Sequence, residues 1–234
     1  MPSTADQNIQ DVVLPGDPVP ASSADAKVIL GPGLTQEKDV IIAMKAGVLM
    51  HEETYNRWWV ESNQRRYVSS TGESVIGIVT ARIAEGFKVE IGAAHQALLP
   101  LLAFEGATKK NRPNLAVGAL VYARVSLANR DMEPELECIN PTTGRADGFG
   151  ELKGGFMFRC SLGLCRRLLA TETPILSLIG EHFPFEVTIG RNGRVWVNST
   201  QTKTTILITN AIQNSEYLSE KECCEMVKTL VGRL

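Results

Sequence analysis

Three cations lie within four consecutive positions of the sequence, at Lys109, Lys110 and Arg112. Gly106 precedes them and Pro113 follows them, which predicts a loop with a flexible entry and a stiff exit. Ammonium and guanidinium groups bind phosphate oxygens, a contact that positions a nucleic-acid strand without reading its bases. The same three side chains would also suit a solvated loop or a loop that docks on another protein. Phosphate contact is the interpretation that we favour.

Short runs with a period of two lie on either side of this loop. The runs at 75–79, 87–91 and 120–127 all show this period of two, and glycines separate them. Such a pattern predicts strands of a small antiparallel barrel. Barrels of the oligonucleotide-binding type hold single strands with a cationic groove and exposed aromatic rings. The sequence therefore predicts a barrel with its cationic loop beside an open face.

Four further side chains of the predicted barrel are candidates for nucleic-acid contact. Phe87 and Tyr122 lie on expected strands, where an outward ring could stack on a base. Either ring could equally belong to the barrel core. His95 and Arg124 are weaker candidates of the same kind.

The charge balance argues against tight, non-specific duplex binding. The formal net charge is -2, and the first 26 residues carry four aspartates without any Lys or Arg. The other 208 residues therefore have a net charge of only +2, whereas duplex binders usually have a strong excess of cations. A modest contact with a single strand, assisted by partner proteins, stays open.

No catalytic or metal-binding set is predicted, and no cofactor. His51, His95 and His182 are far apart, and none has a ligand partner three or four residues on. Cys160 and Cys165 have the wrong spacing for a zinc knuckle. An odd number of irregularly spaced cysteines favours a reducing compartment. With no basic leader and no apolar run of about 20 residues, we expect an intracellular protein.

Shifts in composition divide the chain into four parts. Residues 1–26 are polar and acidic and are expected to be disordered. Residues 27–63 predict a small β-rich module, 64–145 the barrel, and 146–234 a mixed α+β domain. The fold class is thus mainly β with a C-terminal α+β domain.

Two stretches are expected to connect these elements. The Leu-rich segment 93–104 predicts a short helix or turn across one end of the barrel. The segment 144–155 contains five glycines, which predicts a linker or an extended surface loop.

A glycine pair in the C-terminal domain resembles an RNA clamp but has the wrong setting. RNA-clamping KH domains carry Gly-x-x-Gly between two helices. Here Gly190 and Gly193 lie between two predicted strands, and Asn192-Gly193 is a common type I′ turn pair. We therefore expect a structural or interdomain role for this turn and for Trp196, rather than RNA clamping. Gly31 and Gly33, around a proline, are expected to shape a turn of the N-terminal module.

Three separated motifs carry a family resemblance. They are Phe-Glu-Gly-Ala-Thr-Lys-Lys-Asn-Arg-Pro-Asn at 104–114, Asp-Met-Glu-Pro-Glu at 131–135 and Gly-Arg-Asn-Gly-Arg-Val-Trp-Val at 190–197. Together they resemble the S1/KH cap subunits of the eukaryotic RNA exosome, and in particular the exosome component 3 type. The Gly-Pro-Gly-Leu turn at 31–34 is similar to a motif of that family's N-terminal module. The resemblance covers about residues 28–234.

This resemblance implies an N-terminal β module, an S1 domain of the OB-fold type and a KH domain. It implies a non-catalytic subunit that sits with other caps on a ring of RNase-PH-like proteins. Such a subunit guides single-stranded RNA to an associated 3′–5′ exoribonuclease in RNA processing and decay. The implied location is nucleus, nucleolus and cytoplasm. Two alternatives stay open, a free-standing S1-type RNA-binding protein of translation or transcription, and a nuclease.

Overall fold

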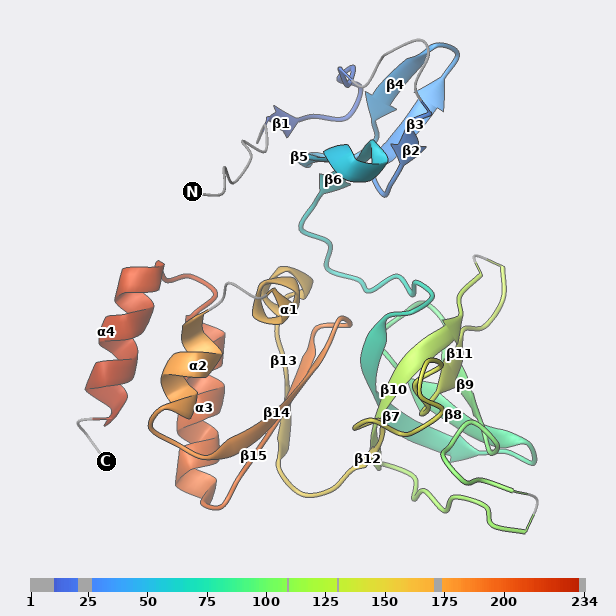
Figure 1. The fold of residues 1–234 in the computed structure, drawn as a ribbon, viewed down its shortest axis with the longest axis vertical. Helices are drawn as coiled ribbons and strands as arrows, with labels where there is room; N and C mark the ends of the chain where they lie inside the picture. Colours follow the sequence, from blue (N-terminus) through green and yellow to red (C-terminus); the bar gives the residue numbers. More distant parts are fainter. Residues whose placement is uncertain (1–10, 21–26, 109, 130, 171–173, 232–234) are drawn as a thin grey trace. The chain divides into compact units, whose positions relative to one another are not determined.

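The computed structural model describes residues 11–20, 27–108, 110–129, 131–170 and 174–231 (Figure 1). The chain divides into two compact units, residues 1–64 and 65–234. Each unit is described by itself.

The first unit is a small β module. Its larger sheet has the order β1-β5-β6-β2, and β3 and β4 form a separate antiparallel pair. Its core is made of Val13, Val19, Ala43, Leu49, Trp58 and Val60. The elements are β1 (Val12–Val13), β2 (Ile29–Leu30), β3 (Leu34–Glu37), β4 (Val40–Ala43), β5 (Gly47–Glu52), the 3-10 helix η1 (Glu53–Tyr55) and β6 (Arg57–Glu61).

Residues 11–20 correct the expectation of a disordered tail. They form β1, which pairs antiparallel with β5. Val13 and Val19 are buried against the module. Short apolar side chains at these two positions bury enough surface to order a segment that is otherwise polar. Residues 1–10 and 21–26 of the expected tail lie outside the described residues.

A barrel begins the second unit. Its sheet has the order β11-β9-β8-β7-β10-β12, and β11 also pairs with β10, which closes the ring. β9 and β11 run parallel, and the other neighbours are antiparallel. The interior is apolar, with Val75, Val79, Val89, Leu99 and Val121 among its buried side chains. The strands are β7 (Ser74–Arg82), β8 (Gly86–Glu90), β9 (Ala97–Pro100), β10 (Leu120–Leu127), β11 (Glu135–Glu137) and β12 (Gly150–Leu152).

Two segments that were expected to connect elements each contain a strand. In the stretch 93–104, Ala97 and Leu99 fill the barrel interior while Leu98 is half-buried, so the period is two rather than helical. The four-residue strand is too short for its alternation to stand out among neighbouring leucines. In the glycine-rich stretch 144–155, β12 pairs with the outer edge of β10. There the hydrogen-bonding edge of β10 determines the structure and the composition does not.

The rest of the second unit is an α+β domain. Its antiparallel sheet has the order β13-β15-β14, and the helices cover one face of it (Figure 1). Phe158, Val195, Ile208 and Ile212 are buried in its core. The elements are β13 (Phe156–Arg159), α1 (Leu162–Leu169), α2 (Pro174–Gly180), β14 (Phe185–Gly190), β15 (Arg194–Ser199), α3 (Thr202–Asn214) and α4 (Glu220–Val231). The predicted fold class is confirmed.

Candidate nucleic-acid interface

The cationic loop lies in the long connection between β9 and β10. Lys110 and Arg112 are exposed there, and Lys109 lies outside the described residues. A tight turn holds the loop, because the Asn111 amide donates to Thr108 Oγ1 at 3.0 Å and the Thr108 amide donates to the Asn111 carbonyl at 2.9 Å. A local turn of this kind presents cations outward without burying them. Lys110 and Arg112 thus lie where a phosphate can reach them.

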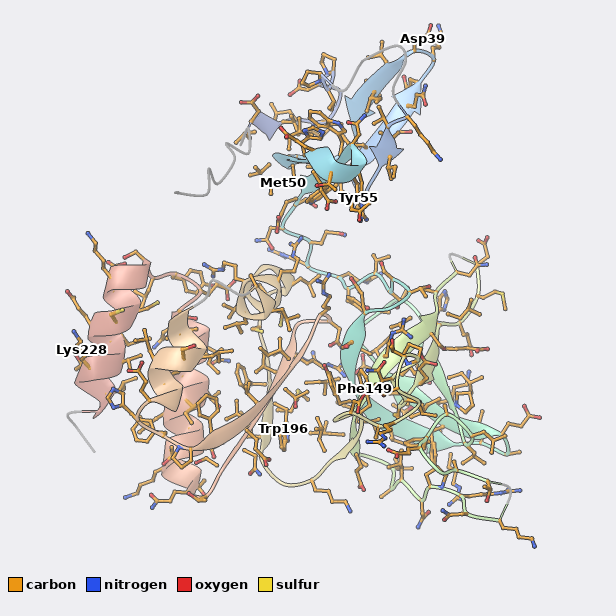
Figure 2. The ribbon with its side chains drawn as sticks, in the orientation of Figure 1. Asp39, Met50, Tyr55, Phe149, Trp196 and Lys228 are labelled. Carbon is orange, nitrogen blue, oxygen red and sulfur yellow. The ribbon has the colours of Figure 1, made fainter. Side chains whose placement is uncertain are left out.

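Tyr122 and Arg124 share the outer face of β10. Both are half-buried, and each already has a partner. The Tyr122 ring stacks on Phe149, with centroids 4.9 Å apart, and Figure 2 shows Phe149 against the barrel. Arg124 Nη1 lies 2.5 Å from Glu137 Oε1. One ring face of Tyr122 and the charge of Arg124 are therefore engaged within the barrel.

The stacking role expected for Phe87 is wrong. Its side chain is 0% exposed and belongs to the barrel core. The period-two pattern places Phe87 on the same face as Val89, and this face points inward. His95, by contrast, is exposed in the turn between β8 and β9.

The order of helices and strands supplies no Gly-x-x-Gly clamp. In a KH domain that clamps RNA, this motif connects two helices. Here the connection between α1 and α2, residues 170–173, contains no glycine. The only part of that connection within the described residues is Ala170. Our expectation that the 190–193 turn does not clamp RNA stays a prediction.

The turn at 190–193 differs in type from the expected one. Gly190 pairs directly with Arg194, so the loop has three residues. Gly193 has φ +76, whereas Asn192 is not among the described residues with positive φ. A type I′ turn needs positive φ at both central residues, so that expectation is wrong. A three-residue loop that ends in a left-handed glycine fits instead, and it leaves the Asn192 side chain projecting from the turn.

The Asn192 side chain contacts the backbone of the barrel wall. Its Oδ1 accepts from the Ile76 amide at 3.2 Å, and its Nδ2 donates to the carbonyls of Ile76 and Ile91, each at 2.8 Å. The residue is 7% exposed. Gly190 allows this approach, since a Cβ there would lie 2.3 Å from Asn192 Oδ1 and 2.8 Å from the Ile76 amide nitrogen. The turn thus completes the hydrogen bonding of the β7 backbone.

Arg194 adds an ion pair to the same contact, with its guanidinium buried. Its guanidinium donates to the Glu90 carboxylate, to the Glu90 carbonyl at 2.7 Å and to the Ile76 carbonyl at 3.2 Å. Its side chain is 3% exposed. Burial acts to raise the pKa of Glu90, but the hydrogen bond and charge of Arg194, helped by the Gly92 amide, outweigh it and hold that pKa below its usual value. Glu90 therefore stays ionised and satisfies the buried guanidinium.

A third contact runs through Glu73. The Arg191 amide donates to the Ser74 carbonyl at 2.9 Å, and Arg191 Nη1 lies 3.5 Å from Glu73 Oε1. Tyr67 Oη donates to the other oxygen of Glu73 at 2.6 Å. Burial, and then this hydrogen bond, raise the pKa of the Tyr67 phenol, so it remains a donor. Together these contacts join the 190–194 turn to the barrel.

The remaining predicted structural residues lie elsewhere. The Trp196 indole is buried and donates to the Gly154 carbonyl at 2.9 Å, close to the start of the α+β domain (Figure 2). Gly31 and Gly33 lie in the first unit, where a Cβ would come within 2.7 Å of Trp59 Cβ and 2.9 Å of Val60 Cβ respectively. These glycines thus permit close packing on β6.

Sequence reasoning missed the barrel side of the contact. Glu73 lies just before β7 and Glu90 ends β8, and nothing in the local pattern marks them as partners of residues more than 100 positions later. The possible signal in the sequence was the run Val75-Ile76-Gly77, in which no residue is polar. Ile76, in the middle of this run, is fully buried in the structure. Three consecutive buried residues on a barrel strand indicate that its outer face is covered.

Within the ranges that the structure describes, no group of three or more His, Cys, Asp or Glu residues could hold a metal ion. Among the same residues, no helix is both long and apolar enough to cross a membrane.

Three family models match successive parts of the chain. Residues 28–66 match the model described as "Exosome complex exonuclease Rrp40 N-terminal domain". Residues 67–150 match "Exosome complex component RRP40, S1 domain", and residues 155–203 match a KH domain. The exosome complex component rrp40 of Schizosaccharomyces pombe is 47% identical over 241 residues, which cover 100% of both chains. This chain belongs to the Rrp40 family of exosome complex components.

Other comparisons agree with this assignment to the Rrp40 family. The exosome complex component RRP40 of Drosophila melanogaster is 42% identical over 220 residues, 93% of each chain. A solved structure described as an exosome complex RNA-binding protein superposes with a TM-score of 0.58 at 20% identity, covering 70% of this chain and 96% of that one. At that identity the likeness shows the fold alone. The barrel is thus the S1 domain, and the α+β domain is the KH domain.

Proposed function

We propose that this chain is the exosome component 3-type cap subunit of its exosome, a non-catalytic RNA-binding protein. One observation carries the RNA-binding part: an S1 barrel presents the exposed Lys110 and Arg112 on a turn held by its own hydrogen bonds. Contacts of this kind hold phosphates without reading sequence. Family membership over the whole length supports the place in the complex.

We further propose its partners and location. The chain sits with the other caps on the ring of RNase-PH-like subunits and directs single-stranded RNA towards the associated 3′–5′ exoribonuclease. It acts in the nucleus, the nucleolus and the cytoplasm. Imaging of the tagged protein in its own cells checks the location. Gel filtration of an extract separates this proposal from a free-standing S1 protein, because only an exosome subunit elutes with a large assembly.

The test of RNA binding uses the reconstituted assembly with the Lys109→Ala, Lys110→Ala, Arg112→Ala triple variant. Its affinity for a labelled single strand is measured by fluorescence anisotropy at several salt concentrations. If all three cations contact phosphates, the slope of log K against log salt falls by about 2, at about 0.7 per cation. Lys203→Ala, on an exposed helical position of the KH domain, is the matched control. An unchanged slope in the triple variant refutes the proposed role of the loop.

A further inference from the structure

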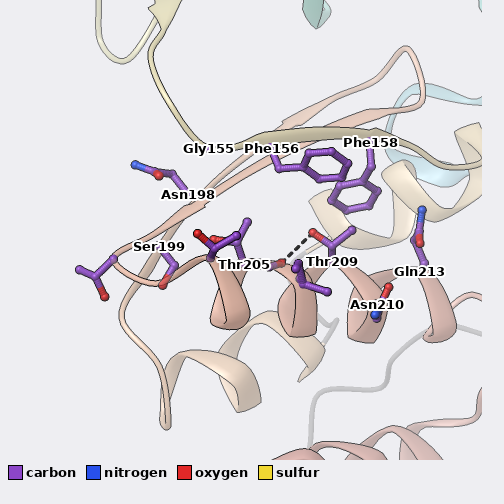
Figure 3. Close-up of a pocket in the computed structure, with 12 residues that line it drawn as sticks. Gly155, Phe156, Phe158, Asn198, Ser199, Thr205, Thr209, Asn210 and Gln213 are labelled. Atoms are coloured by element: carbon purple, nitrogen blue, oxygen red, sulfur yellow. Dashed lines mark hydrogen bonds between the residues drawn. The ribbon is translucent and has the colours of Figure 1, made fainter.

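A groove of about 700 Å³ runs between β13 and α3 of the KH domain (Figure 3). Phe158, Thr205 and Thr209 are buried along it. Phe156 and Ile206 are each 54% exposed, so the groove is open and partly apolar. It is formed by β13 and α3, whereas KH domains that clamp RNA do so between their first two helices.

The groove has the length of a short strand. Its α3 side extends from Thr202 to Gln213. At 1.5 Å per residue this stretch of helix is about 17 Å long. An extended chain rises about 3.4 Å per residue, so about five residues of a strand would span the groove.

One wall of the groove is an open sheet edge. Among the described strands, β13 pairs with β15 alone. The Cys160 amide donates to the Gly193 carbonyl at 3.0 Å, which fixes the direction in which the β13 backbone points. By the period of two, the amide and carbonyl of Met157 point away from β15, as does the Arg159 carbonyl, which accepts from Gln213 Nε2 at 3.5 Å. Because Gln213 already occupies the Arg159 carbonyl, the amide and carbonyl of Met157 are the groups of β13 through which one more strand can pair.

The charges of the lining favour a protein over RNA. The groove is lined by Gly155, Phe156, Phe158, Asn198, Ser199, Thr200, Thr202, Thr205, Ile206, Thr209, Asn210 and Gln213. None of these is charged, so nothing in the groove neutralises a row of phosphates, whose binding depends on cations. Apolar and small polar side chains of a peptide match this lining, and alternate residues of an added strand would point into it.

We propose that this groove binds an extended segment of another exosome subunit, about five residues long and with uncharged inward side chains. The segment adds as a fourth strand beside β13 and inserts an apolar side chain between Phe156 and Ile206. This inference rests on the proposed function of the chain as a cap subunit of the exosome. It assigns to the KH domain a docking role that is separate from the RNA-binding role of the cationic loop in the barrel.

The experiment places the photo-crosslinking residue p-benzoylphenylalanine at Asn210 in the full chain and reconstitutes the exosome from its purified subunits. Mass spectrometry should identify crosslinks to one extended segment of another subunit. We expect Ile206→Lys, which charges an exposed groove position, to lower the crosslink yield at least tenfold. Met157→Pro removes an outward amide that an edge strand does not need for folding, and it should have the same effect. Leu169→Lys, at a 44% exposed position outside the groove, should have none.

Several results would overturn the proposal. Crosslinks to RNA, to a second copy of the chain or to its own N-terminal residues would do so. So would a crosslink yield at Asn210 no higher than the yield with the crosslinker at Leu169, or a yield that neither Ile206→Lys nor Met157→Pro lowers. Urea midpoints of the free variants equal to wild type establish that the fold is intact. A chain that fails to elute with the assembly refutes the proposed function itself. A chain that elutes with the assembly and gives no such crosslink refutes only the docking groove.

Discussion

Replacing Asn192 by alanine should uncouple the KH domain from the S1 barrel. The substitution removes three hydrogen bonds to the barrel backbone. The Ile76 carbonyl keeps a donor in Arg194, but the Ile76 amide and the Ile91 carbonyl lose the partner that Asn192 provides. Each buried group left unsatisfied costs about 1–3 kcal/mol. We therefore expect the substitution to lower the free energy of unfolding of this unit by about 3 kcal/mol.

Urea denaturation followed by fluorescence measures this change. With an m-value of about 2 kcal/mol/M, a loss of about 3 kcal/mol lowers the midpoint by about 1.5 M. Hydrogen exchange at the Ile76 amide gives a local readout, because Asn192 Oδ1 is its acceptor and its protection should fall in the variant. Loss of the contact should also separate the unfolding of the two domains into distinct transitions.

Asn198→Ala is the matched control for this prediction. Asn198 lies on β15, the strand that follows the turn, is half-exposed and makes a 3.4 Å hydrogen bond to Glu186 within the KH domain. Its removal should change the free energy of unfolding by less than about 0.5 kcal/mol. A wild-type midpoint for Asn192→Ala, together with unchanged exchange at Ile76, would refute the argument that the turn secures the barrel.

Three further predictions concern the same unit. Phe87→Ala should lower the free energy of unfolding by about 3–5 kcal/mol, measured by thermal or urea denaturation, because it empties part of the barrel core; a stable variant with impaired RNA binding would contradict this. Because Arg194 holds the folded pKa of Glu90 below its unfolded value, the pair should stabilise the fold above the usual Glu pKa of about 4.3 and lose this effect as pH falls through the folded pKa. Glu90→Gln should therefore flatten the acid limb of a urea-midpoint-against-pH curve, and an unaltered limb would count against the pair. Gly190→Ala should destabilise the unit through its clash with the Ile76 amide, whereas Gly180→Ala, with nothing within 4 Å of its Cβ, should be tolerated in the same denaturation assay.

Local pattern was enough to predict the strands with strong alternation. The runs that became β8 and β10 alternate and place their apolar residues on the inward face, and 75–79 in β7 is a short run of apolar residues and glycine, so the strands and the barrel were predictable. The same pattern could not decide which face of β8 points inward. Phe87 was therefore an RNA candidate until the structure placed it in the core.

Contacts between distant parts of the chain decided the elements that the sequence did not predict. β1 forms because Val12 and Val13 pair with the edge of β5. β12 forms because a glycine-rich segment pairs with the edge of β10. Neither partner is marked in the local sequence. The exposure of Lys110 and Arg112 was predictable for a related reason, since a turn forms through local contacts, whereas the ion pair of Arg194 and Glu90 joins residues more than 100 positions apart.

The turn that resembles an RNA clamp explains how the two domains divide their roles. A clamp needs backbone amides open to a phosphate, but a Cβ at Gly190 would already lie 2.8 Å from the Ile76 amide nitrogen, and Asn192 and Arg194 are buried. Because these groups bind the barrel backbone, the S1 and KH domains are joined through this turn, and we expect the turn not to clamp RNA. The S1 loop that carries Lys110 and Arg112 is therefore presented from a barrel that the KH domain holds in place. In our proposals, RNA contact by this unit depends on the cationic loop of the barrel, and the KH domain offers its β13–α3 groove to another protein.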